Sequence, residues 1–133
     1  MTRREDDKQV IRDRDWLWRR IVNVPQWVTN NGDGSWRVSS AAFRDGHTNE
    51  VSVHLARLTT REEALRDRPD DGLVELEAVV PRSIGLIVAF DPTENDQSHS
   101  LICAPSGGKI SKMQARRMVD AARWLIRPAT IRE

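Results

Sequence analysis

The fold is indicated most clearly by residues 73–104, which read LVELEAVV-PRSIG-LIVAF-DPTENDQ-SHSLICA. Three apolar runs of strand length are separated by stretches rich in proline, glycine, serine and aspartate, which are typical of turns. Within the first run, every second residue is apolar, as in a strand with one buried face. We therefore predict three strands, at 73–80, 86–90 and 98–104; a meander is one way to connect them, and the sequence leaves the order of strands in the sheet open.

The preceding sequence predicts a hairpin. Residues 36–43 and 51–58 have strand composition, and the stretch from Arg44 to His47 between them contains an Asp-Gly pair typical of turns. Asn30 to Gly34 forms a second predicted turn, because Asn, Asp and Gly tolerate left-handed backbone conformations. These elements bring the expected sheet to about five strands.

Two short segments carry helix signals. Residues 16–22 fit either a helix or a strand, and pairs of residues spaced four apart favour a helix. Thr60 can cap a helix that opens at about residue 61, with Glu63 at the spacing of a capping box.

The C-terminal segment predicts the longest helix. Ser111 can cap a helix that runs to about Ile126 and is stopped by Pro128. Its apolar residues cover about half of the circumference, so this face is expected to pack on the sheet. The predicted fold class is α+β: an antiparallel sheet of about five strands with a C-terminal amphipathic helix packed on one face. A flexible charged N-terminus (1–14) precedes a single domain (15–133).

Composition narrows the possible classes of protein. The chain has 133 residues and a single cysteine, Cys103, so it cannot form an internal disulfide. No targeting segment is visible, and no apolar run approaches the roughly 20 residues that a membrane helix needs. We expect a soluble, cytoplasmic protein with no membrane association.

Charge is unevenly distributed along the chain. The formal net charge is +1, but residues 21–108 carry thirteen acidic and seven basic side chains, whereas residues 109–133 carry two acidic and seven basic ones. Five cations would project within an arc of about 60° on a regular C-terminal helix: Lys109, Lys112, Arg116, Arg123 and Arg127. Such a ridge can bind phosphates or an acidic protein surface. The alternative, which the pattern favours, is a solvated face or one that pairs with the domain's own acidic residues.

An aromatic cluster near the N-terminus is a second candidate binding surface. Trp16, Trp18 and Trp27 are flanked by Arg19 and Arg20. Tryptophan and arginine are enriched where proteins bind each other, because they bury large areas and still offer donors. The alternative is a hydrophobic core that uses tryptophan.

A third candidate involves acid–base chemistry. His99 can pair with Asp91 or Asp96, provided that the groups lie within hydrogen-bond reach. A polar hairpin loop beside a histidine explains the same residues without chemistry. His47 and His54 lie far from His99 in the sequence and lack metal-ligand spacing, so we expect no metal site and no cofactor.

Several short motifs resemble those of a loose set of short, uncharacterised bacterial proteins. They are Trp18-Arg19-Arg20, residues 38–43, Val51-Ser52-Val53, and Asp91-Pro92 followed by His99. The resemblance spans about residues 16–125 and implies a bacterial origin, with no activity to carry over.

The sequence thus predicts a small non-catalytic module that binds a partner protein, as a component of a larger bacterial assembly. The first alternative is nucleic-acid backbone binding through the basic helix face. The second is a small hydrolase or transferase centred on His99. Of the three, only the last predicts an enzyme.

Overall fold

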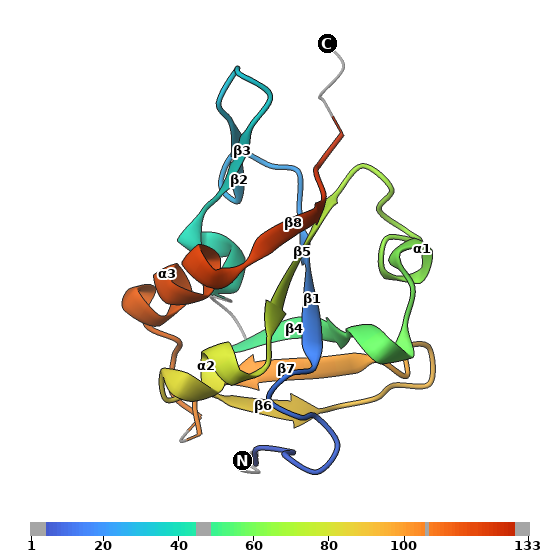
Figure 1. The fold of residues 1–133 in the computed structure, drawn as a ribbon, viewed down its shortest axis with the longest axis vertical. Helices are drawn as coiled ribbons and strands as arrows, with labels where there is room; N and C mark the ends of the chain where they lie inside the picture. Colours follow the sequence, from blue (N-terminus) through green and yellow to red (C-terminus); the bar gives the residue numbers. More distant parts are fainter. Residues whose placement is uncertain (1–4, 45–48, 106, 130–133) are drawn as a thin grey trace.

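Six strands form one antiparallel sheet in the computed structural model of the chain, which describes residues 5–44, 49–105 and 107–129 (Figure 1). In spatial order these strands are β6 (Ile87–Phe90), β7 (His99–Cys103), β4 (Glu50–Leu55), β1 (Trp16–Ile21), β5 (Gly72–Glu77) and β8 (Arg123–Ile126). The α+β class and the antiparallel sheet are confirmed. The sheet has six strands where about five were expected.

A separate hairpin of β2 (Val28–Asn30) and β3 (Trp36–Val38) replaces the hairpin predicted for residues 36–58. Its turn places Gly32 and Gly34 at φ values of 83° and 90°, which only glycine adopts easily. The strand expected to continue to Phe43 ends at Val38. A 3₁₀-helix, η1 (Ser40–Phe43), follows because the Ser39 hydroxyl accepts a hydrogen bond from the Ala41 amide. The predicted turn over 45–47 lies outside the described residues.

Strand β1 occupies the segment for which a helix was favoured, so that prediction is wrong. The strand pairs with β5 along its whole length and with β4 at Leu17 and Trp18. A spacing of four residues keeps side chains on one face of a helix and also on one face of a strand, because four is an even number. Leu17 and Ile21, both fully buried, therefore meet the core from a strand.

Of the meander that residues 73–104 could form, the structure contains only the second half. Strands β6 and β7 pair as a hairpin, but β5 lies between β1 and β8 and does not pair with β6. The helix α2 (Val79–Ser83) ends β5 early and carries the chain across to β6. Sequence spacing did not reveal this crossover.

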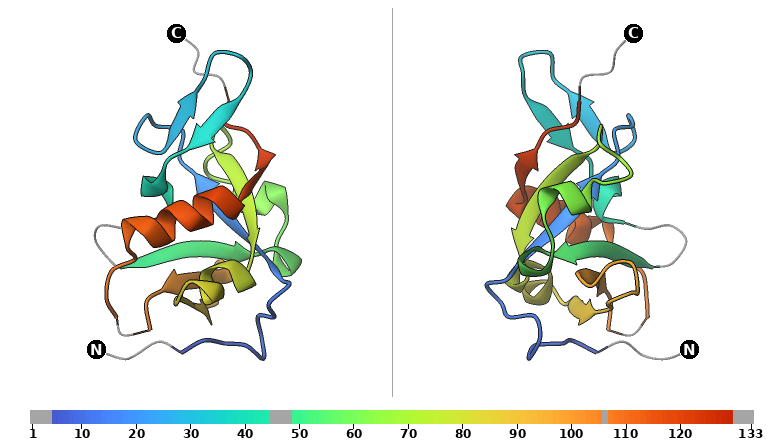
Figure 2. Two further views of the ribbon diagram at one scale, coloured as in Figure 1. Left: turned by 60° about the vertical axis from the view of Figure 1, so that its left-hand side comes forward. Right: turned by 90° about the vertical axis from the view of Figure 1, so that its right-hand side faces the viewer.

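The C-terminal helix, α3 (Lys112–Ala121), starts as predicted and ends five residues early. Ser111 and Gln114 form a complete capping box. Ala122 is extended, and the next residues form β8, paired with β5. The predicted helix over 122–126 is therefore wrong. The helix α3 buries Ala115 and Met118 and lies beside η1 and α2 (Figure 2).

The two faces of the sheet are covered differently. The main core packs on the face beneath η1 and α3, where Phe43 is among the largest fully buried side chains. On the opposite face, the 3₁₀-helix η2 (Ala56–Leu58) and α1 (Arg61–Ala64) follow β4, and a smaller cluster forms around Leu73 (Figure 2). As predicted, the Thr60 hydroxyl caps α1 by accepting a hydrogen bond from the Glu63 amide. We call this second face the outer face.

The N-terminal segment lies against β6, which is an edge strand of the sheet. The Asp7 amide donates to the Val88 carbonyl at 3.0 Å, and the Phe90 amide donates to the Asp7 carboxylate at 2.5 Å. Arg82, whose side chain is 7% exposed, forms ion pairs with Asp6 and Asp13. These contacts hold Asp6, Asp7 and Asp13 against the rest of the domain.

Within the described residues, no helix has the length and apolar character required to cross a membrane.

Candidate active site

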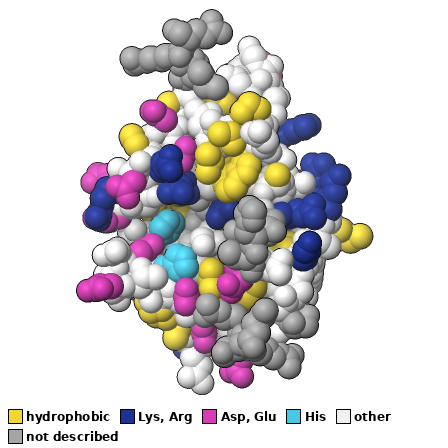
Figure 3. All heavy atoms as spheres, turned by 180° about the vertical axis from the view of Figure 1, so that it is seen from behind, with side chains coloured by type: hydrophobic (Ala, Val, Ile, Leu, Met, Phe, Trp, Pro, Cys, Tyr) yellow, Lys and Arg dark blue, Asp and Glu magenta, His cyan; other side chains and the backbone are white. Residues whose placement is uncertain are grey.

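Two histidines lie side by side on the outer face of the sheet. His54 on β4 and His99 on β7 are register partners, so their side chains leave the sheet on the same side. Ser52 shares this face, because it precedes His54 by two residues on the same strand. Figure 3 shows the two described histidines adjacent at the surface, with acidic and basic side chains around them.

His99 is held from both sides of its ring. Nδ1 lies 2.9 Å from the Asp91 carbonyl oxygen and 3.1 Å from the Asp91 carboxylate. Both partners only accept hydrogen bonds, so Nδ1 carries the proton and Nε2 has a lone pair. Nε2 lies 3.3 Å from the Ser52 hydroxyl, which is exposed. Ser52, His99 and Asp91 thus have the connectivity of a nucleophile, a base and an orienting carboxylate.

His54 makes a second pairing of the same kind. Its Nδ1 lies 3.0 Å from Asp96 Oδ2 and 3.1 Å from the Ser98 hydroxyl. That hydroxyl donates to the other oxygen of Asp96 at 2.5 Å, so the proton between His54 and Asp96 belongs to Nδ1. No hydrogen bond within the described part of the chain engages Nε2 of His54. This nitrogen is available to a ligand.

Burial of the His54 ring lowers its pKa below the usual value for histidine, and nearby His99 and Arg20 lower it further, whereas Asp96 raises it. The net direction is downward, so His54 is neutral at pH 7 and can accept a proton.

Asp96 is fixed by its own loop. Its amide bonds the Thr93 hydroxyl, and its Oδ1 accepts from the amide and hydroxyl of Ser98. Burial by itself raises the pKa of Asp96. The bonds from Ser98, together with the positive charge that both histidines carry when protonated in the acidic range where Asp96 titrates, outweigh burial, and the net effect lowers the pKa of Asp96. Asp96 is therefore ionised and rigidly placed next to His54.

Ser98 is unsuited to be a nucleophile even though it is close to His54. It is fully buried, and it approaches Nδ1, the nitrogen that already carries a proton. Ser52 meets both requirements, since it is exposed and faces the basic nitrogen of its histidine.

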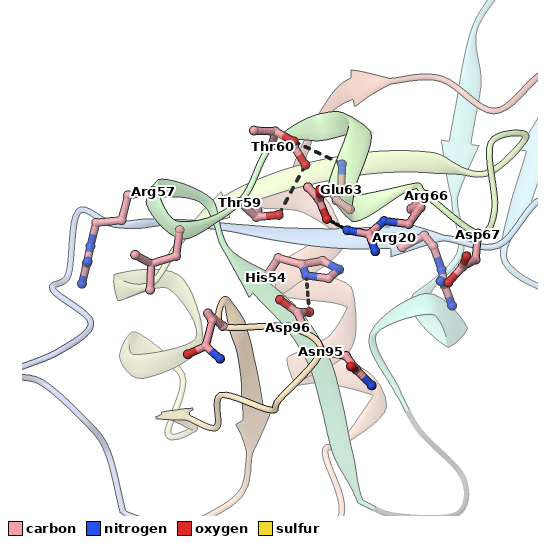
Figure 4. A pocket seen from close by; sticks show the side chains of 13 residues that line it. Arg20, His54, Arg57, Thr59, Thr60, Glu63, Arg66, Asp67, Asn95 and Asp96 are labelled. Atoms are coloured by element: carbon pink, nitrogen blue, oxygen red, sulfur yellow. Dashed lines mark hydrogen bonds and ion pairs between the residues drawn. The ribbon is translucent and has the colours of Figure 1, made fainter.

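A pocket of about 900 Å³ adjoins His54. Figure 4 shows the His54 ring between the 95–97 loop on one side and the residues of α1 on the other, with Arg20 entering from β1. The wall consists mainly of polar and charged side chains, together with Leu58 and Ala64. A ligand in this pocket would lie against the free nitrogen of His54.

The sequence predicted part of this arrangement. Asp91 does contact His99, whereas Asp96 contacts His54 instead. Ser52 was missed as a site residue, and His54 was considered only as a metal ligand. The alternation of residues 51–55 placed Ser52 and His54 on one face of a strand, but only the pairing of β4 with β7 brings His99 to them.

The basic ridge predicted on the C-terminal helix does not form. Lys112 and Arg116 are on α3, Lys109 precedes the helix cap, Arg123 lies in β8, and Arg127 follows that strand. Because the helix ends at residue 121, these cations cannot share one helix face. The prediction of a single ridge is wrong.

Two of these cations are engaged within the domain. Arg123 donates to the buried carboxylate of Glu75 at 2.5 Å, and its guanidinium carbon lies 4.8 Å from the centre of the Trp16 ring. Arg127 donates to the Gly34 carbonyl at 3.4 Å.

The predicted tryptophan cluster divides between the two faces of the sheet. Trp16 and Trp18 alternate with Leu17 and so lie on the outer face, where Trp16 is 36% exposed. Trp27 packs against the main core beneath the guanidinium of Arg19, which lies 4.8 Å from the ring centre. The three side chains therefore do not form one surface. Their role in binding a partner stays a prediction.

No group of three or more potential ligands in the described ranges has the arrangement of a metal site.

No protein-family model, curated protein or solved structure matches the chain.

Proposed function

We propose that the chain is a small hydrolase or transferase in which Ser52 is the nucleophile, His99 the general base, and Asp91 the carboxylate that orients His99. The observation that carries this proposal is the series of contacts from Ser52 Oγ to Nε2 of His99 and from Nδ1 to Asp91. Such a site is defined by geometry and not by the order of its residues in the chain. Contacts of 3.3 Å are common in enzymes without substrate, where catalytic hydrogen bonds are often loose.

Acyl transfer is the chemistry that this arrangement supports best. Ser52 Oγ attacks the carbonyl carbon of an ester while Nε2 of His99 takes the hydroxyl proton. The bond from that carbon to the leaving oxygen breaks, and His99 returns the proton to release an alcohol. A water molecule, deprotonated by His99, then attacks the acyl-serine, releases the acid and restores Ser52. A second alcohol in place of water makes the reaction a transfer.

The other predicted functions have less support. Nucleic-acid binding depended on the basic ridge, and protein binding depended on that ridge and on the tryptophan cluster. Neither surface forms as expected. Both functions stay predictions, as do a cytoplasmic location and a role within a bacterial assembly.

The decisive experiment combines an active-site label with an ester substrate. A fluorophosphonate probe is expected to modify the wild-type chain once, on Ser52, as located by peptide mass spectrometry. Hydrolysis of p-nitrophenyl acetate is expected to stop in Ser52→Ala and to continue in Ser83→Ala. Ser83 is a matched control, because its exposed hydroxyl bonds the Val80 carbonyl and no other group in the described part of the chain. Equal labelling of wild type and Ser52→Ala, or no labelling of the wild type, would overturn the proposal.

A further inference from the structure

Arg20 is the least neutralised of the three arginines that line the pocket. Arg66 is paired with Glu63 on α1, and Arg57 is paired with Asp15 and donates to a backbone carbonyl. Arg20 faces the Asp71 carboxylate, from which its Nε lies 3.5 Å away without making a hydrogen bond. No hydrogen bond to a described residue engages its two terminal nitrogens, and the ion pair with Asp71 is longer than those of Arg57 and Arg66.

The strand register brings Arg20 toward the proposed nucleophile. Trp18 on β1 is opposite His54 on β4, so two residues further along the antiparallel strands lead to Arg20 and Ser52. The strands stop pairing there, and the Arg19 guanidinium reaches the Ser52 carbonyl at 2.8 Å instead. Arg20 and Ser52 therefore share the outer face where the two strands separate.

His54 lies on the same face, two residues beyond Ser52 on β4, and contributes a second polar group. His54, whose Nε2 has no hydrogen bond among the described residues, and Arg20 both line the pocket (Figure 4). A planar guanidinium binds carboxylate or phosphate oxygens through two parallel hydrogen bonds, which gives both strength and orientation.

From this we infer that the pocket binds an anionic group, a carboxylate or a phosphate, through Arg20 and next to His54. One consequence rests on the proposed function: the preferred substrate of Ser52 is an ester that carries such an anion. The anion would hold the ester against the outer face of the sheet, while the reacting carbonyl lies at Ser52.

The test compares a neutral and an anionic ester. We expect kcat/KM for mono-p-nitrophenyl succinate to exceed that for p-nitrophenyl acetate by about 10- to 100-fold, the range of a charge-assisted hydrogen bond pair. Arg20→Gln is expected to abolish this preference, so that the variant hydrolyses the two esters with similar kcat/KM. Arg20→Lys retains the charge opposite Asp71 and is expected to retain part of the preference.

Arg66→Gln is the matched control, because its charge is already paired with Glu63. An equal loss of preference in Arg66→Gln and Arg20→Gln would show a general charge effect and overturn the inference. So would equal rates for the two esters in the wild type.

A binding measurement separates this inference from the proposed function. Titration with succinate or inorganic phosphate, followed by NMR of the His54 ring, is expected to shift the ring signals in the wild type and not in Arg20→Gln. Such shifts in a chain that hydrolyses neither ester would support the anion site and reject the nucleophile. Hydrolysis of both esters at equal rates, with no shifts, would reject the anion site alone.

Discussion

His54 and His99 lie directly opposite each other on β4 and β7, and each ring is held through Nδ1 by a carboxylate from the loop that precedes β7. The two rings therefore have their protons on equivalent nitrogens. Nε2 of His99 reaches Ser52, whereas Nε2 of His54, a residue that lines the pocket, has no hydrogen bond among the described residues. One short loop thus orients two histidines: His99 can accept a proton from the Ser52 hydroxyl, and His54 can bind a ligand.

Replacing Asp91 with Asn should reduce ester hydrolysis by about 10- to 100-fold, because the carboxylate that stabilises protonated His99 is lost. The Asp91 carbonyl still accepts from Nδ1, so the ring should keep its orientation. Steady-state kinetics with p-nitrophenyl acetate measure the loss. Glu94→Gln, an exposed change in the same loop, should have no effect; an unchanged rate in Asp91→Asn would contradict the role given to Asp91.

Replacing Asp96 with Asn should lower the pKa of His54 further. Asp96 favours the charged form of the ring, so its removal leaves burial and the nearby cations to act without opposition. NMR titration of the imidazole signals measures this shift. In the wild type, the same depressed pKa means that His54 contributes stability above pH 6.5, which is lost as pH falls through its folded-state pKa. A pKa of His54 that rises in Asp96→Asn would show that the pairing has been misassigned.

The sequence predicted local features better than long-range pairing. The caps at Thr60 and Ser111 were found because a cap is a local hydrogen bond between residues three apart. The end of α3 was missed, because the apolar residues of 122–126 fit a continuing helix as well as a strand. What stops the helix is the pairing of β8 with β5, a partner some 50 residues earlier.

In the candidate site, too, a contact within one hairpin could be predicted from the sequence, whereas a contact between distant strands could not. Asp91 and His99 belong to one hairpin, so their contact could be predicted from the sequence between them. Ser52 reaches His99 diagonally across two strands that are 47 residues apart in the chain. That contact could not be predicted from the sequence, because it depends on the register of β4 against β7.

Arg82→Ala should destabilise the fold by about 3–5 kcal/mol, the usual effect of breaking a buried ion pair by removing one partner. Its guanidinium connects Asp6, Asp13 and the Ile11 carbonyl, so the N-terminal segment should loosen. Urea denaturation measures the loss, and hydrogen exchange at Val88 and Phe90 should accelerate. The exposed Arg68→Ala is the control. Unchanged exchange at the two amides would show that Arg82 does not hold this segment.

Gly72→Ala should destabilise the fold by about 1–3 kcal/mol, because an added Cβ would overpack its site. That Cβ would lie 2.7 Å from the Trp124 ring and 2.9 Å from Pro128. Gly32→Ala offers a comparison, since its surroundings are open and only its positive φ is unfavourable. Thermal denaturation of the two variants should show the larger loss in Gly72→Ala. Equal stabilities would mean that β8 can move to make room.

The contacts of Asp6 and Asp7 have a practical consequence for handling the protein. Unpaired amides on a terminal strand invite a neighbouring molecule to add a strand of its own, which starts aggregation. Here the carboxylates accept from the Val88 and Phe90 amides of β6. A purification tag fused close to Met1 would disturb this protection, so a C-terminal tag should give the better-behaved preparation.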